Sequence, residues 1–141
     1  MTPLEALQAT LAGEHAAIYV YGVIGGRLSA SAEPVLASRV QACYVTHRSR
    51  RDQLISMVRA AGAEPVAAYV SYQLPTPAGT TRELAAAARR TEQRCARVYA
   101  DMVGSTSRAN RQFAIDALTD AAVRQLGFGG PAQSFPGIAE L

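Results

Sequence analysis

The sequence predicts an all-α protein, a single bundle of four helices. The 141 residues are rich in alanine, lack tryptophan and contain only 6% aromatic residues, a composition typical of closely packed helices. Apolar residues recur with alternating spacings of three and four in three long segments, as on the buried face of a helix. Finally, the connections between the predicted helices follow the order short, long, short.

The first two helices are expected at residues 3–30 and 34–61. The first helix begins at a capping box, in which Thr2 caps the backbone and Glu5 returns the reciprocal bond. The second ends before Gly62, a residue type that favours helix termination. Only a short turn separates the two helices, so they should form an antiparallel hairpin.

The third and fourth helices are expected at residues 81–104 and 108–127, followed by a Gly- and Pro-rich tail at 128–141. The connection formed by residues 62–79 is too long for a simple turn. Helices of about 27 residues are roughly 40 Å long, a distance that this connection can cover when extended. One long crossover between the second and third helices resembles the topology of ferritin-like bundles. Two helical hairpins packed in another arrangement are the alternative.

Polar residues interrupt the apolar stripes near the middle of three helices. Glu14, His47 and Glu92 each occupy a stripe position that should face the core. On the fourth helix, Asp116 and Asp120 flank the inward face, and either could turn inward. Because all these residues lie near the midpoints of their helices, we expect them to meet in one layer.

Buried carboxylates and imidazoles need partners, and two kinds of partner are considered. One is iron or manganese, held by Glu14, His47 and Glu92. The other is an ion-pair network in which Arg50 or Arg51 adds positive charge to that of the histidine. The network is favoured because a di-metal site takes a Glu-x-x-His motif from each of two helices. Here Tyr44 stands at the Glu position of the second helix, and no histidine follows either aspartate of the fourth.

The chain also resembles a known family. The likeness is carried by residues 12–17 (AGEHAA) with Tyr19 and Gly22, by residues 47–52 (HRSRRD), and by residues 135–137 (FPG). These segments resemble the small actinobacterial ferritin-like proteins of the DUF4439 family. The resemblance implies a ferritin-like fold and no particular substrate. It also implies that the three stripe-breaking residues match ligand positions of the superfamily, from which Tyr44, Thr119 and Val123 depart.

Two functions follow from these patterns. The preferred one is a non-enzymatic bundle whose di-metal site has degenerated into a polar core, which needs no cofactor and binds an unidentified protein or small molecule. The alternative is an oxidoreductase that binds iron or manganese with a reduced ligand set.

Composition and charge set expectations for partners and location. All 14 basic side chains are arginines and the formal net charge is only +3, so no nucleic-acid partner is expected. No apolar run is long enough for a membrane span. Two cysteines, Cys43 and Cys95, are consistent with free thiols in a reducing cytoplasm. Residues 16–26 carry no charge on any face, so a homodimer is expected there, unless the crossover around Tyr69 and Tyr72 or the tail covers them.

Overall fold

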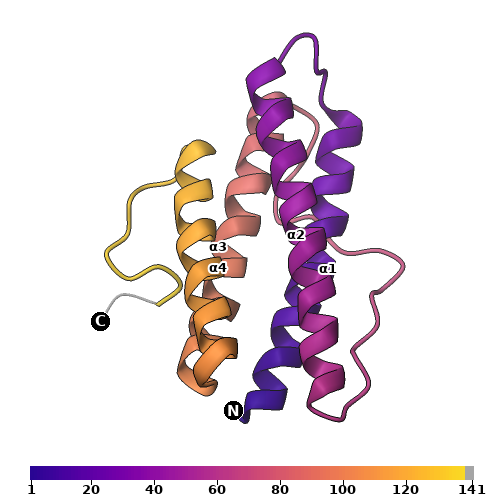
Figure 1. The fold of residues 1–141 in the computed structure, drawn as a ribbon. Coiled ribbons are helices and arrows are strands. Elements are labelled where there is room, and N and C mark those ends of the chain that lie inside the picture. Colours follow the sequence, from indigo (N-terminus) through magenta and orange to yellow (C-terminus); the bar gives the residue numbers. More distant parts are fainter. Residues whose placement is uncertain (139–141) are drawn as a thin grey trace.

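The computed structural model describes residues 1–138. These residues contain four helices and no strand. The helices are α1 (Pro3–Arg27), α2 (Pro34–Ala60), α3 (Thr81–Ser105) and α4 (Arg108–Gly127). The closely packed pairs are α1 with α2, α1 with α3, and α3 with α4. The predicted four-helix bundle is therefore confirmed (Figure 1).

The connection between α2 and α3 runs along α1 from one end of the bundle to the other (Figure 1). Consequently α2 and α3 run parallel, and the predicted ferritin-like topology with one long crossover is confirmed. The crossover also covers part of the uncharged stretch of α1. Three of its contacts mark this path along α1. Gln8 Nε2 donates to the Glu64 carbonyl at 2.7 Å, the rings of Tyr19 and Tyr72 lie 5.7 Å apart between centroids, and Arg27 Nη1 donates to the Ala78 carbonyl at 3.2 Å.

One helix boundary, the C-terminal end of α1, differs from its predicted position by more than one residue. The first helix was expected to reach residue 30, whereas α1 ends at Arg27 and Leu28 already has an extended backbone. The reason is a local turn in which Ser29 Oγ accepts a hydrogen bond from the Ala32 N–H, an interaction that competes with helix formation. The other helix ends lie within one residue of the predicted positions.

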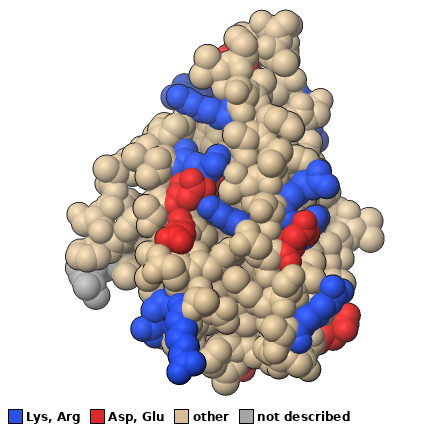
Figure 2. All heavy atoms as spheres, in the orientation of Figure 1, with Lys and Arg blue, Asp and Glu red and all other residues tan. Residues whose placement is uncertain are grey.

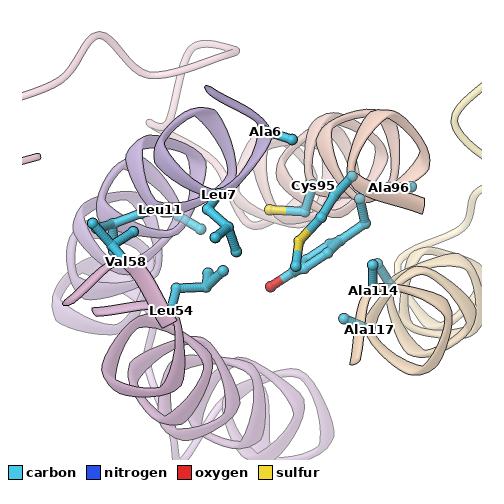
Figure 3. Close-up of a cluster of buried hydrophobic side chains, with 13 residues drawn as sticks. Ala6, Leu7, Leu11, Leu54, Val58, Cys95, Ala96, Ala114 and Ala117 are labelled. Carbon is cyan, nitrogen blue, oxygen red and sulfur yellow. The ribbon is translucent and has the colours of Figure 1, made fainter. Parts of the chain in front are cut away.

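The apolar core consists of two clusters, one on each side of a polar layer. The first cluster, shown in Figure 3, includes Leu7, Leu11, Leu54, Val58, Tyr99, Met102 and Ala114. The second includes Val20, Tyr21, Ile24, Val40, Leu84 and Phe128. Between them, at mid-length of their helices, lie the buried side chains of Glu14, His47 and Glu92.

The described part of the C-terminal tail lies against α3. At Gly137, φ is +79°, and a Cβ atom there would lie 2.3 Å from the Ala96 carbonyl oxygen. The tail therefore approaches the α3 backbone near Gly137, and its first residue, Phe128, packs against Tyr21 of α1 with 6.3 Å between ring centroids. Residues 139–141 lie outside the described residues. Within residues 1–138, no helix combines the length and apolarity that crossing a membrane requires.

Candidate functional site: a buried carboxylate and histidine layer

The centre of the site is a histidine held between two carboxylates. His47 Nδ1 lies 2.5 Å from Glu14 Oε2, and His47 Nε2 lies 2.9 Å from Glu92 Oε1. The three side chains come from α2, α1 and α3, and none of the residues is more than 1% exposed. The structure thus brings together the three residues that interrupt the apolar stripes.

His47 is a cation in this arrangement. An ionised carboxylate only accepts hydrogen bonds, so both ring nitrogens must carry protons to satisfy both partners. Burial alone would lower the pKa of His47, but the charges and hydrogen bonds of Glu14 and Glu92 outweigh it and raise the pKa to about 9. Burial alone would likewise raise the pKa of Glu92, yet the hydrogen bond and charge of His47 leave it below its usual value.

Two tyrosines complete the layer, and the sequence interpretation placed neither in it. Tyr21 on α1 donates a 2.6 Å hydrogen bond to Glu92 Oε1 on α3, and Tyr99 on α3 donates to Glu14 Oε1 on α1. Burial and the neighbouring carboxylates raise the pKa of each tyrosine well above its usual value, so both hydroxyls keep their protons. Tyr21 also stacks on His47, with 5.4 Å between ring centroids.

The tyrosine contacts follow a repeat that is visible in the sequence. Tyr21 stands seven residues after Glu14, and Tyr99 stands seven residues after Glu92. Side chains on a helix lean toward its N-terminus, so each tyrosine hydroxyl reaches back to the level of the glutamates. Because α1 and α3 are antiparallel, each hydroxyl meets the glutamate of the opposite helix (Figure 1). The Glu-x6-Tyr spacing was therefore a signal that could have identified both tyrosines.

An arginine and aspartate group joins α2 to α4 beside the layer. Arg50 Nη2 and Arg124 Nε lie 2.5 Å and 2.7 Å from the same oxygen, Asp120 Oδ2. Burial would raise the pKa of Asp120, but Arg124 and Arg50 hold it below its usual value. Arg124 also donates to Cys43 Sγ at 3.3 Å, and Arg50 lies 5.6 Å from the Tyr99 ring centroid. The sequence interpretation included Arg50 and Asp120 but not Arg124.

Three other candidate residues lie outside the layer. Arg51 pairs with the neighbouring Asp52 at the surface, because it is turned about 100° around the helix from Arg50. Asp116 is exposed on α4 and accepts a hydrogen bond from Gln112. Tyr44 is half-buried among the apolar residues between α1 and α2 and makes no hydrogen bond to the glutamates.

These residues do not fit a di-metal centre. Such a centre takes about four carboxylates and two imidazoles, whereas this layer holds two carboxylates and one imidazole. Both nitrogens of His47 and three of the four glutamate oxygens already have partners. The fourth, Glu92 Oε2, is buried without a hydrogen-bond partner among residues 1–138, as is the neighbouring Arg50 Nη1.

Charge balance offers another explanation of how the layer is stabilised. Three carboxylates and three cations lie in the layer and its flank. The carboxylates are Glu14, Glu92 and Asp120. The cations are His47, Arg50 and Arg124. The group is therefore neutral with its protons alone, and no additional cation is needed to compensate the buried carboxylates.

A thiol also borders the layer. Donor atoms of Glu14, His47 and Cys95 all lie within 4.8 Å of one another. Both cysteines are buried and free, as the sequence indicated. Burial raises the pKa of Cys95 well above its usual value, and the nearby glutamates add to this effect, so the sulfur carries a proton. The sequence spacing puts Cys95 about one helical turn from the level of Glu92 and His47, and the structure brings its sulfur beside the donor atoms of Glu14 and His47.

Comparisons with solved structures support the same fold. A conserved hypothetical protein from Mycobacterium tuberculosis is 33% identical in sequence, with a TM-score of 0.83 over 90% of this chain and 94% of that one. A ferritin-like, diiron-carboxylate protein from Bacillus anthracis strain Ames is 18% identical, with a TM-score of 0.75 over 90% and 92% of the two chains. At that identity the second likeness concerns the fold alone. No curated protein matches this sequence.

A family model matches almost the entire chain. The match covers residues 6–140, which include all the residues of the polar layer. The family is described as a domain of unknown function, so membership brings no substrate or reaction with it. The chain belongs to the DUF4439 family, and its bundle has the ferritin-like fold.

Proposed function

We propose that this protein is a non-enzymatic ferritin-like bundle in which a neutral network of protons and arginines takes the place of a di-metal centre. The network would hold the helices in register, and the bundle would serve as a structural or binding component for a protein or small-molecule partner. The observation that carries this proposal is the position of His47, whose two ring nitrogens are both engaged by carboxylates.

The proposal rests on what an oxidase centre requires. A catalytic metal needs an open coordination position and access for its substrate. In this protein the layer is buried, and all its carboxylate and imidazole atoms except Glu92 Oε2 already pair with one another or with tyrosine hydroxyls. Two divalent ions would bring four positive charges to a group that is already neutral, so four protons would have to leave it, next to the fixed charge of Arg50.

Elemental analysis tests this function directly. The full-length protein is produced in medium supplemented with iron and manganese, purified without chelator, and compared with a Glu14→Gln variant. We expect both proteins to contain far less than one iron or manganese ion per chain. Two ions per chain in the wild type, lost in the variant, would overturn the proposal.

The second candidate is an oxidoreductase that binds iron or manganese with the reduced set Glu14, His47 and Glu92. It is favoured by one observation, the buried Glu92 Oε2, which has no hydrogen-bond partner among residues 1–138. An oxygen-consumption assay separates the two functions: the protein is loaded with ferrous iron without oxygen, and oxygen is then admitted. Turnover that depends on Glu92 would support the oxidoreductase, and its absence supports the structural role.

Assembly and location are proposed on separate grounds. A homodimer is proposed because the crossover that covers α1 itself presents apolar side chains to the outside, with Tyr69 75% and Val70 100% exposed. A cytoplasmic location is proposed because Cys43 and Cys95 are free. On the face drawn in Figure 2, arginines and acidic residues are interspersed, which supports a role without a nucleic-acid partner.

A further inference from the structure

We propose that the polar layer can exchange two of its protons for one thiophilic divalent cation of the Zn²⁺ class, bound by Cys95, His47 and Glu14. This mononuclear site goes beyond the proposed structural role, which needs no ion. Its three ligands come from α3, α2 and α1, so a bound ion would link three helices.

The donor atoms are close to the positions that such an ion requires. Zn²⁺ binds sulfur at about 2.3 Å and nitrogen or oxygen at about 2.0–2.2 Å, so tetrahedral ligands lie roughly 3.3–3.8 Å apart. The donor atoms of Cys95, His47 and Glu14 all lie within 4.8 Å of one another. Figure 3 shows Cys95 turned toward the interior of the bundle. Side-chain shifts of about 1 Å would therefore complete the three-ligand set.

Supporting hydrogen bonds for these ligands are already present. A metal-binding histidine usually donates its other ring N–H to a carboxylate, which fixes the orientation of the ring. Here His47 Nε2 lies 2.9 Å from Glu92 Oε1, and Tyr21 holds the same oxygen at 2.6 Å. Tyr99 in turn donates to Glu14. His47 can therefore bind an ion through Nδ1 while Nε2 keeps its bond to Glu92.

The exchange conserves the charge of the layer. His47 gives up the Nδ1 proton that now lies between it and Glu14, and the Cys95 thiol gives up its proton to become a thiolate. Two positive charges leave as protons and two arrive with the ion, so no further residue must change its charge. A donor set of one sulfur, one nitrogen and one oxygen suits Zn²⁺ better than the oxygen-rich sets of iron and manganese centres.

Cobalt provides the test, because Co²⁺ replaces Zn²⁺ and gives a thiolate charge-transfer band in the near ultraviolet. Reduced full-length protein is loaded in two ways, by titration of the native protein and by refolding in the presence of Co²⁺. We expect a band that saturates at one ion per chain, about two protons released per ion, and loss of the band on adding Zn²⁺. A wild-type protein that shows no band after either loading overturns the proposal.

The second buried cysteine supplies a matched control. Cys95→Ser should abolish the band, whereas Cys43→Ser should keep it, since Cys43 accepts a bond from Arg124 and is not part of the donor group. Circular dichroism confirms that each variant is folded. A band retained in Cys95→Ser, or lost in a folded Cys43→Ser, contradicts the assignment. The proposed structural role has a different test: it is overturned by two iron or manganese ions per chain. The absence of cobalt binding would overturn the zinc-class site and leave the structural role standing.

Discussion

Replacing Glu14 with glutamine is the most direct perturbation of the polar layer. The carboxylate accepts hydrogen bonds from His47 Nδ1 and from the Tyr99 hydroxyl, and the residue is 1% exposed. Glutamine has nearly the same shape but only one oxygen, so its amide hydrogens must face one of the two donors. The change also leaves three cations opposite two carboxylates. We expect Glu14→Gln to lower the free energy of unfolding by about 2–4 kcal/mol, a large share of the stability of a small domain.

The same substitution should change how stability depends on pH. The pKa of His47 is raised from 6.5 to about 9, so the folded protein holds a proton that the unfolded chain releases earlier. The stabilisation is complete below pH 6.5 and is lost as the pH rises toward 9. Over this whole pH range, the raised pKa of His47 changes the free energy of unfolding by about 3 kcal/mol. Without the charge of Glu14, the pKa of His47 should fall and this loss should become much smaller.

Urea unfolding followed by circular dichroism measures both effects, from about pH 6 to about pH 8.5 and with reductant present. The slope is taken below about pH 7.5, because unfolded thiols have a pKa of about 8.5. Their ionisation would also lower stability, since burial raises the pKa of Cys43 and Cys95. His15→Gln is the control, since His15 contacts the Val66 carbonyl at the surface and lies outside the layer. A Glu14→Gln variant with the wild-type slope, or a loss below about 1 kcal/mol, would refute the reasoning.

Three further predictions concern other parts of the molecule. Tyr99→Phe should lower the free energy of unfolding by about 1–3 kcal/mol in urea titrations, because Glu14 Oε1 then loses its hydrogen-bond partner. Tyr21→Phe should cost less, because Glu92 Oε1 keeps its bond to His47. Gly137→Ala should release the tail from α3 through its positive φ and its clash with the Ala96 carbonyl, giving faster C-terminal proteolysis with an unchanged unfolding midpoint. Size-exclusion chromatography with light scattering should show a dimer; a monomer at all concentrations contradicts the proposed assembly.

The fold was readable from the sequence because each of its signals is local or periodic. The capping box at Thr2 and Glu5 is present, and the long connection of residues 62–79 crosses the bundle because no shorter path joins α2 to a parallel α3. The early end of α1 was not predicted. There a serine turn competes with the helix, and serine is also tolerated within helices, so the residue types alone do not decide between the two.

The centre of the candidate site was predictable for the same reason. Glu14, His47 and Glu92 are conspicuous because a charged or titratable residue in an apolar stripe requires a partner in the core. Tyrosine is not conspicuous in this way, because its ring suits an apolar stripe and its hydroxyl adds no charge. On their apolar stripes Tyr21 and Tyr99 therefore resemble ordinary core residues, although their matching spacing from the two glutamates carried the missing information.

The flank of the site was harder to predict, because it depends on small rotations and long side chains. Arg50 and Arg51 are neighbours in sequence, yet only Arg50 reaches Asp120 and the layer. Arg124 lies one helical turn after Asp120, the spacing of an ordinary surface pair, but its guanidinium extends to Cys43 on α2. Periodicity places a side chain on a face of the helix; it does not say how far a flexible arginine extends from that face.

The four helices are not equally close, and the arginines lie where two of them are farther apart. A di-metal centre draws its ligands to within about 2 Å of two ions, and so pulls all four helices toward one point. In this protein α1 and α3 are joined by two short tyrosine–carboxylate bonds and pack closely. By contrast, α2 and α4 approach each other less closely and are bridged by arginines, whose long planar heads span a wider gap while binding the shared Asp120. The arginines thus keep the group neutral while joining α2 to α4 across this wider gap.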